Sequence, residues 1–187
     1  MNRARHILVA LALVAPAGCM SPVNDDAREA LGGEAPGVPA NEYHRPGQPC
    51  LVCHGEYGGT GPIMAVAGTV FATPTPNPVP VEKARVTLTD SNGTTVSKET
   101  NCVGNFFFTQ DEWTPAFPLR AEIECPRPGS TERRRFVMGT RIGRDGSCGG
   151  CHQGAPGLDS PGWVYCAETM PDPPFVVSPG CPGVPQK

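Results

Sequence analysis

The chain has 187 residues, of which 39% are hydrophobic and 18% are charged, and its formal net charge is −3. An acidic chain does not offer the basic surface that nucleic acids require, so we expect no nucleic-acid partner. Glycine and proline each occur 23 times. About a quarter of the chain therefore favours turns, which predicts many loops between short elements.

Residues 1–18 have the pattern of a secretory signal peptide. Two arginines open it, an apolar run covers residues 7–14, and an Ala-Gly pair precedes Cys19. That run is far shorter than the ~20 apolar residues of a membrane-spanning helix. The small residues before Cys19 resemble the lipobox of bacterial lipoproteins, although Pro16 stands where that motif usually has an aliphatic residue. The resemblance implies that Cys19 is the lipidated first residue of the mature chain; ordinary cleavage with a free Cys19 is the alternative.

Export by this route would place the protein in the periplasm, at the outer membrane as a lipoprotein, or at the cell surface. Removal of residues 1–18 leaves 169 residues with a net charge of −5, enough for one domain or two small ones. Residues 19–42 are small, polar and rich in proline and glycine, which predicts a flexible tether with one brief helical pattern at 25–31.

The pattern C-x-x-C-H occurs twice, as CLVCH at 50–54 within a first segment, 43–64, and as CGGCH at 148–152 within a second, 139–187. This pattern is typical of covalent haem attachment, in which the cysteines form thioether bonds and the histidine binds the iron. Chance alone gives ~0.01 matches for a chain with 9 Cys and 4 His. We therefore predict two covalently bound haem c groups. Their binding residues would be Cys50, Cys53, His54, Cys148, Cys151 and His152.

The segment 65–138 between the two motifs is rich in strand patterns. Apolar side chains alternate with polar ones in its short runs, and Asn92-Gly93 is a hairpin turn signal. The proline-rich stretch 73–80 is predicted to be a loop. The predicted strands are 66–72, 84–90, 94–100, 105–109, 119–124 and 134–138. Six short strands without a long amphipathic helix predict a mainly β fold, a small β-sandwich flanked by loop-rich haem-binding segments with little helix.

Three motifs of the segment 65–138 give it a family resemblance. Gly-Thr-Val at 68–70, V-x-L-x-D-x-x-G at 86–93 and Gly-Asn-Phe at 104–106 resemble the carboxypeptidase-regulatory-like, or prealbumin-like, β-sandwich. A haem motif on each side of such a domain resembles exported bacterial multihaem cytochromes. The sandwich itself implies no catalysis, so the function must come from the haem sites. The resemblance to such cytochromes implies an electron carrier.

The small number of histidines limits the axial ligands of the two irons. His6 lies in the signal peptide and His54 and His152 belong to the motifs, so only His44 remains. At most one haem can therefore have two histidine ligands from the same chain. We expect His44, which precedes Cys50 across a stretch with proline and glycine, to bind the first haem. Binding to the second haem and a plain surface position are the alternatives.

Methionine is the other common sixth ligand, and it raises the reduction potential relative to histidine. Met138 is our candidate for the second haem, because a glycine-rich loop joins it to Cys148. A core position beside Phe136 explains Met138 equally well. Met64 is the alternative to His44 at the first haem.

Four cysteines remain outside the motifs and the lipobox, and they are Cys102, Cys125, Cys166 and Cys181. An even number in an exported chain predicts two disulfides, with free buried thiols as the alternative. Three pairings are possible, of which Cys102–Cys125 with Cys166–Cys181 is the most local.

Together these patterns predict a membrane-anchored dihaem cytochrome that carries electrons and is not an enzyme. Its expected partners are redox proteins such as other cytochromes or a reductase, the membrane through the lipid, and further haem proteins in a multihaem assembly. A dihaem enzyme such as a peroxidase, which needs an open sixth site, and a scaffold or adhesion lipoprotein are the alternatives. Zinc binding by the two C-x-x-C pairs is a third, disfavoured by the histidine after each pair and by export.

Overall fold

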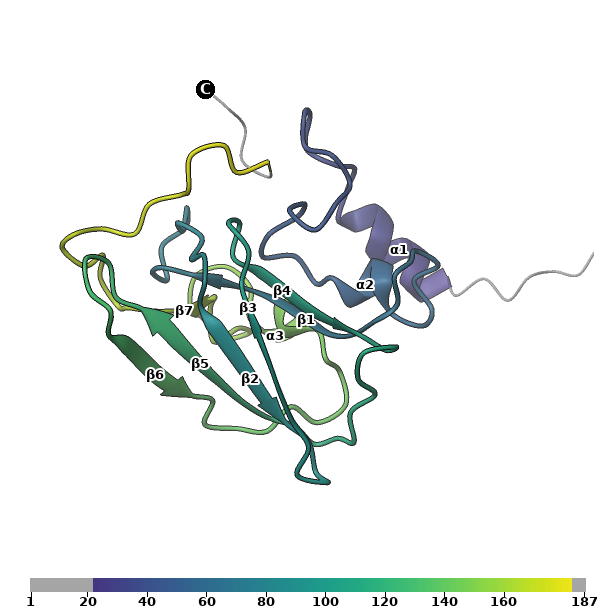
Figure 1. Ribbon diagram of the computed structural model, residues 1–187. Helices are drawn as coiled ribbons and strands as arrows, with labels where there is room; N and C mark the ends of the chain where they lie inside the picture. The colour runs from purple at the N-terminus through teal and green to yellow at the C-terminus, as the bar shows by residue number, and fades with distance from the viewer. Residues whose placement is uncertain (1–21, 183–187) are drawn as a thin grey trace, which may run out of the picture.

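The computed structural model describes residues 22–182, and within them two β-sheets are accompanied by three short helices (Figure 1). The helices are α1 (Pro22–Ala30), α2 (Leu51–His54) and α3 (Cys148–Cys151). The strands are β1 (Met64–Phe71), β2 (Arg85–Thr89), β3 (Thr95–Glu99), β4 (Asn105–Thr109), β5 (Arg120–Pro126), β6 (Arg133–Val137) and β7 (Val164–Tyr165). The predicted mainly β fold with little helix is confirmed, and the six predicted strands lie within two residues of β1 to β6.

The strands form one sheet in the order β4-β1-β7 and another in the order β3-β2-β5-β6. All pairs are antiparallel except β1 with β7, which is parallel. The hairpin between β2 and β3 turns at Gly93, whose φ of 85° is a backbone conformation that glycine adopts readily. Asp90 stabilises this turn, because its side-chain oxygen accepts hydrogen bonds from the backbone N–H groups of Asn92 and Thr94 at 2.9 and 2.8 Å.

The core lies between the two sheets. Even-numbered side chains of β1 and β4 meet those of β2 in one buried cluster, because successive residues of a strand point to opposite faces. The members from these strands are Val66, Val70, Val86, Leu88, Phe106 and Phe108. Every residue of β1 is buried, so its outer face is covered as well.

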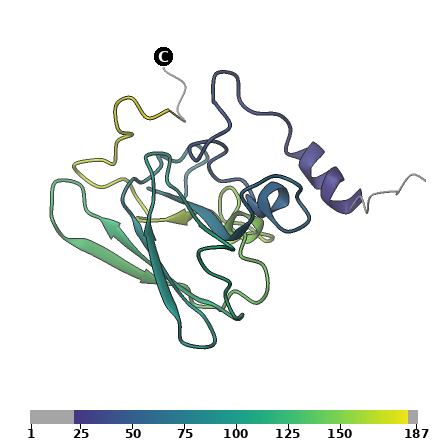
Figure 2. The same ribbon diagram turned by 45° about the vertical axis from the view of Figure 1, so that its right-hand side comes forward.

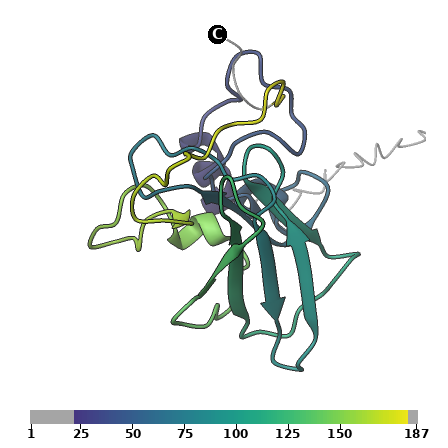
Figure 3. The same cartoon turned by 60° about the vertical axis from the view of Figure 1, so that its left-hand side comes forward.

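The two motif helices pack against β1. Both α2 and α3 contact β1 (Figures 1 and 2). The hairpin tip projects away from α1 and α3 (Figure 3). The backbone N–H of Ala67 in β1 donates to the carbonyl of Gly146 at 3.0 Å. The chain that leads into α3 therefore pairs with the edge of β1.

The first described residues pack against the first motif. Asn24 in α1 donates a hydrogen bond from its side chain to the carbonyl of Val52 in α2 at 3.2 Å. None of the helices within 22–182 has the length and apolar character needed to cross a bilayer. The predicted signal peptide and the lipidation site Cys19 lie outside the described residues.

Two disulfides are present, as predicted, but the most local pairing is wrong. Cys102 bonds to Cys181 and Cys125 bonds to Cys166, with Cα–Cα distances of 5.8 and 5.6 Å. Cys125 in β5 of the second sheet bonds to the residue directly after β7 of the first sheet, so this bridge joins the two sheets, and Cys102 before β4 is tied to the C-terminal segment at Cys181. The motif cysteines, which are Cys50, Cys53, Cys148 and Cys151, are all free thiols.

Candidate haem-binding sites

The first motif places its histidine through the short helix α2. His54 is buried, with 7% of its surface exposed, and its Nδ1 lies 3.2 Å from the carbonyl oxygen of Pro62. A carbonyl oxygen only accepts hydrogen bonds, so Nδ1 must carry a proton, and in the neutral ring the lone pair is then on Nε2. Histidines that bind metals are commonly held in this way.

His44 faces His54 across the first cavity. The two ring centroids are 5.8 Å apart and the ring planes differ by 18°. Two metal–nitrogen bonds of ~2.0 Å, with ~1.1 Å from each nitrogen to its ring centre, require a centroid separation of about 6 Å. The separation equals this length, and because the rings are stacked, their nitrogens must turn toward each other before one iron could bind both.

Two further properties of His44 suit a ligand. Its Nδ1 is buried and has no hydrogen-bond partner within the described part of the chain. Its pKa is lowered, chiefly because burial disfavours the charged imidazolium, and nearby His54 and Arg45 act in the same direction against the opposing effect of Glu34. A neutral imidazole is the form that binds metals.

The first cavity measures about 450 Å³, which is within the usual range for a bound cofactor. Its lining includes His44, His54, Cys50 and Cys53, so the predicted residues of the first site lie together. Met64, the predicted alternative ligand, lines the same cavity and is 8% exposed. The structure thus places both candidate sixth ligands at one site, and which of them binds stays a prediction.

The second motif repeats the arrangement of the first. Nδ1 of His152 lies 2.9 Å from the carbonyl oxygen of Gly162, so Nδ1 again carries the proton and Nε2 is again available. These two carbonyl partners were not predicted from the sequence, although a pair of one glycine and one proline follows each motif, Gly61-Pro62 after the first and Pro161-Gly162 after the second.

The second cavity measures about 600 Å³ and opens into the space between the two sheets. Met138, the predicted sixth ligand, lines it together with Cys148, Cys151 and His152. Arg141 lines it too and supplies a positive charge. Apolar side chains from the inner sheet faces complete the wall, and they include Val86, Leu88, Phe106, Ala121, Ile123 and Phe136.

The two sites lie close together, on opposite faces of the β4–β1 pair. Ala67 and Phe107 line the first cavity, whereas the neighbouring Phe106 is paired with Gly68 and reaches the second as well. A Cβ added at Gly68 would lie 2.7 Å from the Cβ of Cys148, so only glycine allows α3 to approach β1 this closely.

The motif thiols are also close to each other. Burial raises the pKa of the Cys148 thiol to about 12, and the neighbouring Cys50 adds to this shift. Burial is the chief cause that raises the pKa of Cys50 as well, to about 11. Both are neutral thiols at ordinary pH, and both residues are partly buried.

No group of three or more His, Cys, Asp or Glu side chains within 22–182 is arranged to hold a metal ion on its own. A haem brings four nitrogen ligands of its own, so each of its sites needs only one or two ligands from the chain. Comparison with protein-family models, with curated proteins and with solved structures found no match. The predicted family resemblance therefore stays a prediction.

Proposed function

We propose that the protein is a dihaem c-type cytochrome that carries electrons. The observation that carries the proposal is the twofold occurrence of a C-x-x-C-H histidine whose Nδ1 proton is held by a backbone carbonyl, at His54 and at His152. Each leaves Nε2 free in a cavity that also contains the two cysteines of its motif. Haem bound in this way supplies reversible one-electron chemistry at its iron.

The residues of the chain have distinct roles in this proposal. The motif cysteines would hold two haems covalently, and His54 and His152 would be the iron ligands that the motifs supply. His44 is the proposed second ligand at the first site and Met138 at the second. Because a methionine ligand raises the potential relative to histidine, the second haem is expected to accept electrons first.

The surroundings of the sites suit electron transfer. The second cavity is lined mostly by apolar side chains from the sandwich core, and Arg141 offers a charge partner for a haem carboxylate, in a wall that also contains Glu122, Asp145 and Glu168. The sites are separated by a single layer of β-sheet at Gly68 and Phe106. This short separation supports electron exchange between the two centres within one chain.

The wider setting is proposed from the sequence. Export and a lipid on Cys19 would hold the protein at a membrane, in the periplasm or at the outer membrane. Other cytochromes or a reductase would then be its redox partners. A dihaem peroxidase needs an open sixth position, and the opposed rings of His44 and His54 speak against one at the first site.

The test is to express the full chain in a host with a haem c maturation system and to measure its mass. Two covalently bound haems that resist acid-acetone extraction are expected. Replacing Cys50 and Cys53 by Ala should remove one haem, and replacing Cys148 and Cys151 should remove the other. The double variant Cys102→Ala/Cys181→Ala is the matched control and should keep both. A wild-type chain without covalent haem would refute the proposal.

Near-infrared magnetic circular dichroism then separates the proposed ligand sets. We expect one His/His and one His/Met haem in the ferric protein. The Met138→Leu variant should lose the His/Met signal and keep the His/His signal. Two His/Met haems would instead assign Met64 to the first site.

A further inference from the structure

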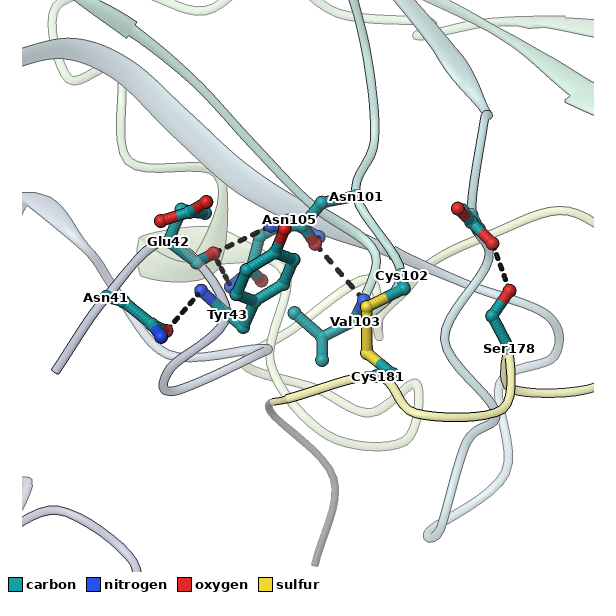
Figure 4. Close-up of a disulfide and its surroundings, with 10 residues drawn as sticks. Asn41, Glu42, Tyr43, Asn101, Cys102, Val103, Asn105, Ser178 and Cys181 are labelled. Atoms are coloured by element: carbon teal, nitrogen blue, oxygen red, sulfur yellow. Dashed lines mark hydrogen bonds between the residues drawn. A yellow bond between two sulfur atoms is a disulfide. The ribbon is translucent and has the colours of Figure 1, made fainter. Parts of the chain in front are cut away.

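The segment that carries His44 is held by side chains of β4 and of the turn before it, and Figure 4 shows its residue Glu42 beside Asn101 and Asn105. The side-chain amide of Asn105 in β4 donates to the carbonyl of His44 at 2.9 Å and to that of Glu42 at 3.3 Å. The amide of Asn101, in the turn before β4, donates to the carbonyl of Glu42 at 2.7 Å. These bonds join residues about sixty positions apart in the chain.

Asn105 is itself fixed by Thr69, the residue opposite it in β1. The hydroxyl of Thr69 donates to the Asn105 side-chain oxygen at 2.7 Å and accepts a hydrogen bond from the backbone N–H of Gly47 at 2.8 Å. Thr69 is buried. Asn105 and Thr69 thus hold the His44 segment at three backbone groups. These are the carbonyls of Glu42 and His44 and the N–H of Gly47.

Arg45, the residue after His44, anchors the same segment to other parts of the chain. Its φ of 49° is in the left-handed region, which a non-glycine residue rarely adopts. Its guanidinium donates to Glu34 and to the side chain of Gln48, both at 2.8 Å, and to the carbonyl of Leu31 at 3.3 Å. The backbone around His44 is therefore fixed by bonds to its neighbours.

The imidazole of His44 is held differently from those of the motif histidines. His54 and His152 are oriented by hydrogen bonds of their own rings, whereas Nδ1 of His44 has no such partner among the described residues. The position of the His44 ring therefore depends on its backbone anchors. Met64 lines the same cavity from β1 and offers a competing thioether ligand.

We propose that Asn105, held by Thr69, is the positioning residue that makes His44 rather than Met64 the sixth ligand at the first site. The inference rests on the proposed function, because it presumes a haem on the first motif. Loss of the Asn105 amide removes two hydrogen bonds to the His44 segment. Loss of these hydrogen bonds should shift the equilibrium between iron-bound and released His44 about 10-fold toward the released form.

The experiment uses the haem-loaded full chain and the variant Asn105→Ala, with Asn105→Asp as a variant of nearly the same shape that lacks the amide donor. Ferric protein is titrated with imidazole, which competes with His44 for the iron. The apparent affinity of the first haem for imidazole should rise about 10-fold in both variants. Part of the His/His signal in near-infrared magnetic circular dichroism should be replaced by a His/Met signal, and the added substitution Met64→Leu should abolish that new signal.

Two further variants keep the test decisive. Thr69→Val preserves shape and strand preference but removes the hydroxyl, so it should raise imidazole affinity in the same direction even if Asn105→Ala does not fold. Asn77→Ala, at an exposed asparagine in the loop between β1 and β2, is the matched control and should change nothing. The signal of the second haem should be the same in all of them.

The outcomes separate the two ideas. A wild-type chain without covalent haem refutes the proposed function. Two haems in the wild type, together with unchanged imidazole affinity and ligand signals in the Asn105 and Thr69 variants, would overturn this inference alone.

Discussion

Gly149 offers a direct test of the contact between the two motifs. It lies between the cysteines of the second motif, and a Cβ added there would be 2.6 Å from the carbonyl oxygen of Gln48 and 2.8 Å from its carbonyl carbon. Both are backbone atoms just before Cys50, so no side-chain rotation relieves the clash. Gly150, the next residue, meets nothing closer than 3.6 Å.

These distances predict opposite results for two neighbouring substitutions. Gly149→Ala should lower the free energy of unfolding by about 1–3 kcal/mol, the usual cost of forcing one extra carbon into a packed site. Gly150→Ala should leave stability unchanged or raise it by about 0.4–1 kcal/mol, because alanine restricts the unfolded chain. The larger effect at Gly149 arises although alanine suits a helix better than glycine in both positions.

The assay is urea unfolding of the two variants and the wild type, followed by far-ultraviolet circular dichroism. Both variants keep all C-x-x-C-H ligands, so haem content should stay the same as in the wild type and serves as the internal control. Equal unfolding midpoints for Gly149→Ala and Gly150→Ala would refute the reasoning, because the motif helix α3 would then not pack on the chain at Gln48.

Two other perturbations have calculable outcomes. Replacing Cys125 and Cys166 by Ala opens a loop with a sequence separation of 41. Loop-closure entropy predicts that the free energy of unfolding falls by about 4 kcal/mol. Guanidinium unfolding measures this change, and a fall of under ~1 kcal/mol would contradict the presence of the bridge. Glu112→Gln removes the ion pair in which Lys98 Nζ contacts both carboxylate oxygens, at 2.7 and 2.8 Å. The hydrogen bond from Lys98, and after it that from the Thr109 backbone N–H, hold the pKa of Glu112 below its usual value. The ion pair therefore stabilises the fold fully above pH ~4.3, the ordinary glutamate pKa, and this stabilisation is lost as the pH falls through the lowered pKa. Because the pair is exposed, the variant should be less stable by under ~1 kcal/mol at neutral pH, and its urea midpoint should converge with that of the wild type in acid; a gap that persists in acid would count against this assignment.

The strands were predictable because their burial follows a local alternation. In β4, Phe106 and Phe108 share the inner face, and the sequence shows this period directly. β7 was missed because it is two residues long and exists only through its parallel pairing with Val70 and Phe71 of β1. The choice among the three disulfide pairings stayed open for a similar reason, because the bonded cysteines are 79 and 41 positions apart and no local pattern marks them as partners.

The candidate sites were predictable only in part. The motifs themselves identify the cysteines and histidines, and the histidine count pointed to His44, which the structure places opposite His54. The role of Asn105 could not be predicted, because its bond to His44 spans 61 positions and no local pattern marks it. The position of the two cavities on opposite faces of one strand pair likewise depends on long-range packing.

The distance between the β2–β3 hairpin and the motif helices has a practical consequence. The turn at Asn92 and Gly93 is exposed, closes on Asp90, and projects away from α1 and α3 (Figure 3). A cysteine or an affinity tag inserted there would let the protein be attached to an electrode in a fixed orientation, with both motifs away from the point of attachment. Voltammetry of such a film would test for the two proposed haem centres without disturbing the side chains proposed to hold them.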